Sequence, residues 1–213
     1  MIEKLFQIIA PDTCLVCQQE GCCICKDCEK AKLVTKKPAC PICNSLNNDW
    51  RTCNNCYRKT DLRGAYVAYR YESEIKDLIW AMKFENKRSI ANYFAEKLGL
   101  LEGVVCYVPS DGRTRRTRGY DQAELIAKRY AKINNLPLER ALLRLKHTRQ
   151  VGKGRAERIK NISGNFLATK DMNGKNVILI DDVITTGATV SECAKVLKQA
   201  GAKNVWALAV AKR

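Results

Sequence analysis

The sequence contains no long apolar run. Across 213 residues, no stretch approaches the roughly 18 consecutive apolar residues that a membrane-spanning helix requires. The apolar residues near the N-terminus are interrupted by Glu3 and are not followed by a cleavage site of small residues, so they are too few for a signal peptide. The sequence therefore argues against a helical membrane protein and against export, and we expect a cytoplasmic protein.

Histidine is almost absent. The one histidine, His147, lies in a polar stretch, where a solvated side chain is more common than a catalytic base, so we assign no acid–base role to it. Internal repeats and low-complexity segments are absent as well, so nothing suggests a repeat architecture.

Cysteine, by contrast, is abundant. The chain has twelve cysteines, and ten of them lie between Cys14 and Cys56. Without an export signal we expect these thiols to stay reduced, which favours metal binding over a disulfide scaffold. Reactive redox thiols are a further alternative.

Eight of these cysteines form four CxxC pairs, which predict two zinc sites. Two thiolates separated by two residues can hold one tetrahedral ion, and a second pair completes the coordination shell. Because each set offers four sulfurs and no open position, structural zinc is favoured over catalytic zinc. Pairing in sequence order is the simplest, with Cys14, Cys17, Cys25 and Cys28 on one ion and Cys40, Cys43, Cys53 and Cys56 on the other. The spacing also permits a crossed arrangement, and Cys22 or Cys23 could replace Cys25.

Residues 1–60 form the first of two predicted domains, a double zinc ribbon. Few apolar residues populate this segment, so its folding should depend on the metal. It holds nine Lys or Arg and six Asp or Glu, and two tetrathiolate zinc centres, each with a formal charge of about −2, would make it slightly negative. Zinc ribbons often bind nucleic acid, but the basic excess of this chain, with a net charge of +16, lies elsewhere.

Residues 61–213 form the second predicted domain, in which strand and helix patterns alternate. Lys83 closes one helix, where a lysine complements the helix dipole or reaches an anion. The alternation predicts a mainly parallel sheet with helices on both faces. Strands are expected at 64–69, 104–108, 177–180 and 205–210, helices at 72–84, 91–101, 120–134 and 190–200, and a short strand or helix at 142–145.

The stretch 177–189 carries the strongest functional pattern. A strand buried on both faces is expected to end in two adjacent carboxylates, before a loop of small residues and an amphipathic helix. Backbone N–H groups of the loop and the helix N-terminus can bind an anion, threonine hydroxyls add donors, and the carboxylates can accept ribose hydroxyls or hold Mg²⁺. A simple helix cap is the alternative, but the pattern favours a phosphorylated sugar. The predicted binding residues are Asp181, Asp182, Thr185, Thr186, Gly187, Ala188 and Thr189.

Most of the basic excess lies between Arg113 and Lys160, where 15 Lys or Arg stand against four Asp or Glu. Part of it is a polar stretch at 110–119, predicted as a loop, that should leave the same edge of a parallel sheet as the acidic loop. Its arginines can bind pyrophosphate oxygens in a bidentate manner, whereas a solvated basic loop is the alternative. We expect residues 146–161 to form a mobile lid over bound polyphosphate. The candidate pyrophosphate and lid residues are Arg113, Arg115, Arg116, Arg118 and Arg158.

The run Ile180-Asp181-Asp182-Val183-Ile184-Thr185-Thr186-Gly187 resembles the signature of type I phosphoribosyltransferases that binds 5-phosphoribosyl 1-pyrophosphate (PRPP). Together with the cysteine pairs and the segments 79–84 and 118–124, it makes the whole chain similar to the ComF family of competence-associated proteins. In that family a cysteine-rich zinc module precedes a phosphoribosyltransferase-like domain. The family more commonly has Asn where Asp121 stands. Thr148, Gln150, Arg158, Asn161 and Phe166 also fit the family pattern.

The resemblance implies that PRPP binds with Mg²⁺ at Asp181, Asp182 and residues 185–189. It also implies a role in moving single-stranded DNA across the inner membrane during natural transformation, with proteins of the DNA-uptake machinery as partners.

Two functions follow as hypotheses. In the first, the phosphoribosyl fold is a PRPP-responsive platform for single-stranded DNA, which the stretch Arg113–Lys160 attracts. Aromatic residues for base stacking are sparse in that stretch, with only Tyr120 and Tyr130. In the second, the protein is an active phosphoribosyltransferase that transfers ribose phosphate from PRPP to an amine or nucleobase, with Asp181 and Asp182 at the catalytic centre.

Overall fold

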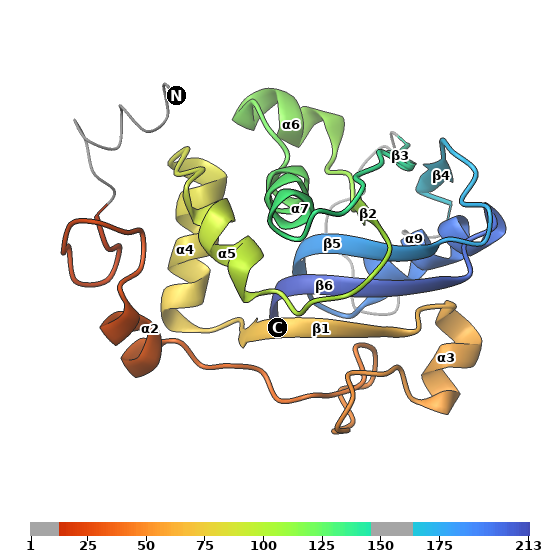
Figure 1. Ribbon diagram of the computed structural model, residues 1–213, viewed down its shortest axis with the longest axis horizontal. Helices are drawn as coiled ribbons and strands as arrows, with labels where there is room; N and C mark the ends of the chain where they lie inside the picture. The colour runs from red at the N-terminus through yellow and green to blue at the C-terminus, as the bar shows by residue number, and fades with distance from the viewer. Residues whose placement is uncertain (1–12, 146–163) are drawn as a thin grey trace, which may run out of the picture.

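The computed structural model describes residues 13–145 and 164–213, with the backbone alone at residues 113 and 114. The predicted lid at 146–161, with its Arg158, lies outside the described residues. The described chain is built around one four-stranded sheet, with helices on both faces and the cysteine-rich segment along one edge (Figure 1).

All four strands of this sheet are parallel. Their order is β1 (Gly64–Arg70), β6 (Asn204–Lys212), β5 (Asn176–Ile184) and β2 (Val104–Tyr107). The two longest strands, β5 and β6, lie at the centre, where apolar side chains are covered from both sides, as expected for a parallel sheet. The predicted parallel sheet is therefore confirmed.

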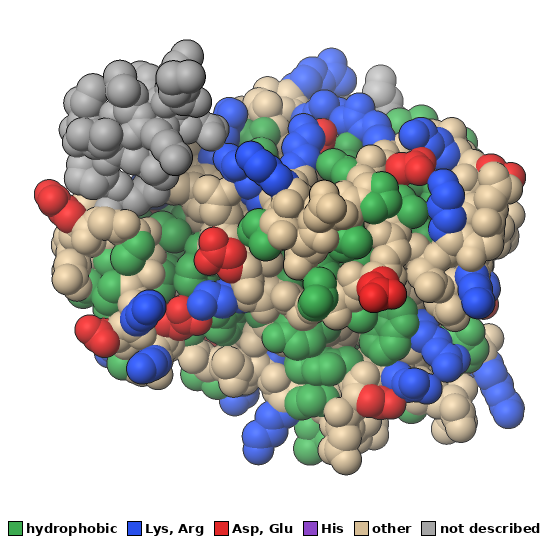
Figure 2. Space-filling model, viewed as in Figure 1, with side chains coloured by type: hydrophobic (Ala, Val, Ile, Leu, Met, Phe, Trp, Pro, Cys, Tyr) green, Lys and Arg blue, Asp and Glu red, His purple; other side chains and the backbone are tan. Residues whose placement is uncertain are grey.

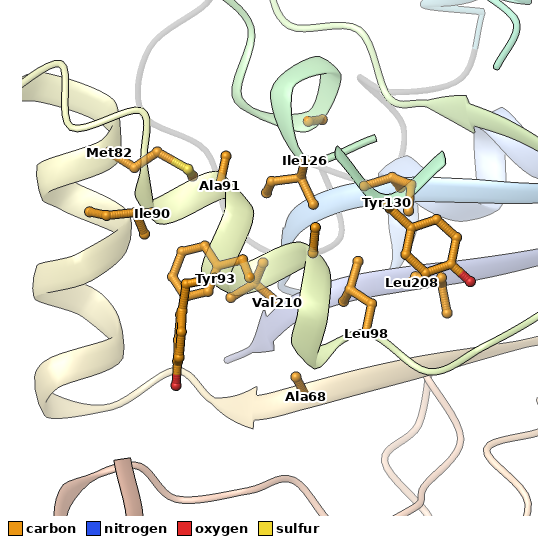
Figure 3. Packing of buried hydrophobic residues seen from close by; sticks show 14 of the residues in the cluster. Ala68, Met82, Ile90, Ala91, Tyr93, Leu98, Ile126, Tyr130, Leu208 and Val210 are labelled. Atoms are coloured by element: carbon orange, nitrogen blue, oxygen red, sulfur yellow. The ribbon is translucent and has the colours of Figure 1, made fainter. Parts of the chain in front are cut away.

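Three helices cover one face of the sheet: α4 (Ser73–Phe84), α5 (Ile90–Lys97) and α7 (Gln122–Ile133) (Figure 1). Each presents apolar residues at helical spacing to the core. Figure 3 shows these buried side chains gathered against Leu208 and Val210 of β6. Burial of each large apolar side chain contributes about 1.5–3 kcal/mol, so this face is a main source of stability.

The opposite face is covered by α9 (Ala188–Gln199). The apolar stripe predicted for this helix is buried against Val177 and Leu179 of β5, while the alternate residues Ile178 and Ile180 face the other helices. Strand β5 is therefore buried on both faces, as its uninterrupted apolar sequence indicates. The buried stripe consists of Val190, Cys193, Ala194 and Leu197.

Two sequence-based predictions are wrong in detail. The stretch predicted as a loop at 110–119 contains a helix, α6 (Gly112–Arg118), since arginine has a high helix propensity. Strand β5 does not end at the aspartates but continues to Ile184, because Asp181 and the residues after it keep pairing with β6.

The remaining described elements are small. The strands β3 (Leu142–Arg144) and β4 (Phe166–Ala168) form a separate antiparallel pair, so the predicted element at 142–145 is a strand. The helix predicted at 91–101 already ends at Lys97. No helix in the described parts of the chain is long and apolar enough to cross a membrane.

The cysteine-rich segment runs along β1, the edge strand of the sheet (Figure 1). Antiparallel bridges join Thr35 to Tyr69 and Arg51 to Gly64. The segment therefore covers a strand edge that would otherwise be open to pairing with another chain. It contains two short helices, α2 (Lys26–Lys32) and α3 (Asn54–Thr60).

Candidate functional site

The eight predicted zinc ligands lie in two groups that follow the sequence order. Within each group the four sulfur atoms lie within 4.8 Å of one another. The crossed arrangement is therefore wrong, and neither Cys22 nor Cys23 belongs to a group, among cysteines that all lie in the described residues. We call Cys14, Cys17, Cys25 and Cys28 the first cluster, and Cys40, Cys43, Cys53 and Cys56 the second cluster.

In both clusters a backbone N–H group donates a hydrogen bond to one of the four sulfur atoms. Cys25 N–H donates to Cys14 Sγ at 3.4 Å, and Cys53 N–H donates to Cys40 Sγ at 3.5 Å. Burial raises the pKa of these two thiols, but the backbone N–H groups outweigh it and lower the pKa of Cys14 to about 6 and that of Cys40 to about 7. Neighbouring sulfur atoms raise the pKa of Cys28, and burial together with neighbouring sulfur atoms raises that of Cys56. A cation would offset this repulsion among four thiolates, so both sets fit Zn²⁺ with four sulfur ligands.

The acidic pair lies on β5, near the turn that leads into α9. Asp182 forms an ion pair with Lys83 at the end of α4, and the two side chains are only 16% and 23% exposed. The N–H of Asp182 donates to Oδ1 of Asp181 at 2.9 Å, and the N–H of Val183 donates to Oδ1 of Asp182 at 2.8 Å. Lys83 was predicted to complement the helix dipole or reach an anion, and the anion it reaches is Asp182.

The ionised form of Asp181 is disfavoured by its surroundings. Burial raises the pKa of Asp181 well above its usual range, and the adjacent charge of Asp182 raises it further, while Lys83 has the opposite effect. When both carboxylates are ionised, Lys83 balances only one of them. A hard cation beside Asp181 would relieve this repulsion, and carboxylate oxygens are the ligands that Mg²⁺ prefers, so the donor set fits Mg²⁺.

The turn between β5 and α9 suits an anion. Gly187 has a φ of +78° and stands at the N-cap of α9, a conformation that glycine adopts without strain. Thr186 Oγ1 accepts a hydrogen bond from the N–H of Ala188 at 3.3 Å, which shapes the turn. The first N–H groups of a helix have no carbonyl partner within that helix. They can therefore donate hydrogen bonds to an anion, together with the hydroxyls of Thr185 and Thr189.

The second cluster touches this turn. A Cβ atom added at Gly187 would lie 2.7 Å from Cδ1 of Ile42 and 3.0 Å from the carbonyl oxygen of Pro41. Lys212, at the end of β6, is buried, and its Nζ donates to the carbonyl oxygens of Pro41 at 2.7 Å and Thr185 at 3.1 Å. The loop between the first two ligands of the second cluster is therefore packed against the turn and tied to it by one lysine.

The β2–α6–α7 connection lies beside β5, because β2 and β5 pair in parallel. Asp121 is the N-cap of α7, accepting from the N–H of Ala123 at 3.1 Å and from the N–H of Ser110 at 2.7 Å. These hydrogen bonds fix the shape of the connection. They give the carboxylate of Asp121 a structural role beside the basic helix α6, so no role in anion binding is needed to explain it.

One basic residue of α6 contacts the end of α4. The guanidinium group of Arg118 lies 4.7 Å from the ring centroid of Phe84, the residue next to Lys83. Arg115 and Arg116 are exposed. Arg113 is described by its backbone alone, and Arg158 lies outside the described residues.

Comparison with known proteins shows the family of this chain. Residues 121–213 match the family model described as Phosphoribosyl transferase domain. Competence protein F of Haemophilus influenzae is 30% identical over 207 residues, covering 87% of this chain and 90% of that protein. Competence protein ComFC of Bacillus subtilis is 28% identical over 196 residues (84% and 79% covered), and DNA utilization protein YhgH of Escherichia coli K12 is 27% identical over 211 residues (87% and 89% covered). The chain belongs to the ComF family.

Membership of the ComF family confirms the predicted fold class, a type I phosphoribosyltransferase-like sheet preceded by a cysteine-rich module with two four-cysteine clusters. The matched range begins at Asp121 and contains β5, the turn and α9. It leaves out Lys83 and the second cluster, which complete the surroundings of the acidic pair and the turn. Lys212 and Ile42 were not predicted as part of the site. Their only signals in the sequence are a lysine that ends an apolar strand and an apolar residue inside a CxxC pair.

Proposed function

We propose that this ComF-family protein binds PRPP with Mg²⁺ at the end of β5 and acts on single-stranded DNA during its uptake. The observation that carries the proposal is the sequence of groups along one strand and turn: two adjacent carboxylates, three threonines and a helix N-terminus, with Lys83 beside them. The proposed ligand-binding residues are Asp181, Asp182, Thr185, Thr186, Gly187, Ala188 and Thr189.

Each part of PRPP has a counterpart in this arrangement. The 5-phosphate suits the N–H groups of the turn and the first turn of α9. The ribose hydroxyls suit the carboxylates of Asp181 and Asp182, which would also hold Mg²⁺, whose charge offsets that of the pyrophosphate. The arginines of α6, which follows the neighbouring strand, would receive the pyrophosphate.

The DNA role is supported by the relatives and by charge. Two relatives are named competence proteins, and a third is named a DNA utilization protein. The net charge of +16 provides the attraction for a polyanion. We propose a cytoplasmic location, where the clustered thiols would stay reduced and available to a metal ion. Proteins of the DNA-uptake machinery are the expected partners.

The second candidate is an active phosphoribosyltransferase in nucleotide salvage or metabolism. It is favoured by the position of α6 after β2, the strand that pairs with β5, because arginines on this neighbouring connection would stabilise the charge that builds on departing pyrophosphate. Asp181 and Asp182 would then touch the reacting sugar. Phosphorus NMR of Mg-PRPP with the zinc-loaded protein and a pool of amines and nucleobases separates the two candidates. Release of pyrophosphate above the rate without protein supports the enzyme, whereas binding without release supports the platform.

Calorimetry of Mg-PRPP binding tests the site itself. The double variant Asp181→Asn/Asp182→Asn should lose measurable binding while its melting temperature stays near that of the wild type. The control, Glu96→Gln/Glu102→Gln, removes two negative charges from exposed positions and should bind normally. Normal binding by the aspartate variant would show that the site is misplaced.

A further inference from the structure

Two large aromatic side chains of α4 face away from the core. Trp80 and Phe84 have exposed fractions of 54% and 58%, and their ring centroids lie 5.5 Å apart. The opposite face of the helix, which includes Ile79 and Met82, is buried. We call Trp80 and Phe84 the aromatic step. A contiguous exposed pair of this kind, unlike a single exposed residue, often marks an interaction site.

Arginines border the aromatic step. Arg118 lies over the ring of Phe84 at 4.7 Å, and Arg88 lies over the ring of Tyr120 at 4.5 Å. The hydroxyl of Tyr120 donates to the carbonyl of Met82, which ties the connection between α6 and α7 to the end of α4. The step and its arginines are therefore held together by α4, α6 and the residues that follow these two helices.

The charge around the step is positive. Arg115 and Arg116 are exposed on α6, and Figure 2 shows Lys and Arg side chains gathered along the upper edge of the view, where Figure 1 places α6. Glu85, which follows the step, is paired with Lys87 at 3.5 Å. A second copy of this chain would bring like charges together at this surface, so charge complementarity favours a polyanion with apolar faces.

We propose that the aromatic step and its arginines bind single-stranded DNA. Unpaired bases stack on Trp80 and Phe84, while phosphates pair with Arg88, Arg118 and the exposed arginines of α6. Stacking of bases on aromatic side chains requires no particular sequence, so the surface suits DNA of any sequence. The inference rests on the proposed DNA-handling function and names the surface that would carry it.

The same helix connects this surface to the proposed PRPP site. Lys83 lies between Trp80 and Phe84 in the sequence, and it pairs with Asp182. A strand stacked on the aromatic step would therefore bind the same helix that holds Lys83 against Asp182. Few aromatic residues lie between Arg113 and Lys160 to stack on DNA bases. The fold supplies them from elsewhere in the chain, because Phe84 lies against Arg118 and Trp80 lies beside Phe84.

Fluorescence anisotropy with a labelled oligothymidylate tests the proposal on the full-length, zinc-loaded protein. Trp80→Ala and Phe84→Ala should each weaken binding about tenfold, roughly the loss of one stacked base, and the double variant should weaken it further. Trp80→Phe, which keeps a stacking face, should bind within about twofold of the wild type. The control, Leu46→Ala/Leu100→Ala, truncates two other exposed apolar side chains and should leave binding unchanged.

The outcomes separate this inference from the proposed PRPP site. Mg-PRPP binding, measured by calorimetry on the same variants, should be retained when DNA binding is lost. Wild-type affinity of the double alanine variant for DNA would overturn the inference, as would equal affinity of the wild type for duplex DNA. Self-association that the double variant abolishes would assign the surface to a second copy instead. A wild type that binds no single-stranded DNA would overturn both this inference and the DNA role, and leave the PRPP site to its own calorimetry.

Discussion

The two cysteine clusters have the same ligand set, yet they support different parts of the molecule. Next to the first cluster, Ile24 is buried in the core with α4 and α5, and Glu29 of α2 pairs with Lys97 of α5 at 2.6 Å. Next to the second cluster, Ile42 packs on Gly187 in the turn proposed to bind phosphate. We therefore expect the first metal site to support the packing of the core, and the second metal site to support the binding of the ligand.

The largest difference in Mg-PRPP affinity is expected when one pair of ligands is removed from each cluster. Cys40→Ser/Cys43→Ser should weaken Mg-PRPP binding by about tenfold or more, about 1.4 kcal/mol, because the turn loses its support. Cys14→Ser/Cys17→Ser should leave the affinity within about twofold, a few tenths of a kcal/mol. Calorimetry measures the affinity, and metal analysis should give two zinc ions for the wild type and one for each variant.

An equal loss of PRPP affinity in both cysteine variants would contradict the claim that only the second cluster supports the turn. A wild type that holds a single zinc ion would contradict the assignment of two zinc sites. Where a cysteine variant fails to fold, Ile42→Ala gives the same test without touching a ligand, with a smaller loss of affinity expected.

A pair of glycine variants isolates the contact between the second cluster and the turn. Gly187 and Gly174 have φ values of +78° and +72°, but an added Cβ meets Ile42 only at Gly187 and has open space at Gly174. Gly174→Ala should cost about 1–2 kcal/mol for backbone strain alone. Gly187→Ala should cost a further 1–3 kcal/mol or so from overpacking. Thermal unfolding measures both, and an equal cost would show that Ile42 does not press on the turn.

Removal of the bridging lysine should have an intermediate effect. Lys212→Met removes the two hydrogen bonds that Nζ donates to the carbonyl oxygens of Pro41 and Thr185. The variant should therefore be less stable by about 1–3 kcal/mol and should bind Mg-PRPP severalfold more weakly. Lys195→Met, at an exposed position, is the matched control. Unchanged stability and affinity in Lys212→Met would remove the lysine from the support of the turn.

The smallest effect is expected beside the first cluster. Glu29→Gln removes the charge that pairs with Lys97, and because both side chains are partly exposed the loss of stability should be about 0.5–1 kcal/mol. Mg-PRPP affinity should not change. A clear loss of affinity in this variant would mean that the first cluster also reaches the ligand site.

Much of this arrangement was predictable because it depends on local sequence. CxxC spacing fixes which thiols form a turn, and the apolar run before Asp181 predicts a strand buried on both faces. The helix α6 was not predicted, since the four arginines of the stretch suggested a solvated loop although arginine favours helix. Strand β5 continues past the aspartates because β6 offers backbone partners there, which the sequence of β5 alone does not reveal.

The contacts that complete the site were beyond sequence reasoning. Lys83 meets Asp182, and Lys212 meets Pro41, across separations of many residues that only the packed fold brings together. The same holds for the aromatic step, because Phe84 and Arg118 come from different helices. Periodicity and spacing predict elements, whereas pairs of this kind follow from how the elements pack.

Hydrogen exchange in the presence of Mg-PRPP tests the central claim most directly, because it reports where the ligand binds. We expect slower exchange for the amides of residues 185–190, in the turn and the first residues of α9, and no change in the β3–β4 pair. Slower exchange elsewhere with residues 185–190 unaffected would contradict the assignment of this turn as the phosphate-binding site.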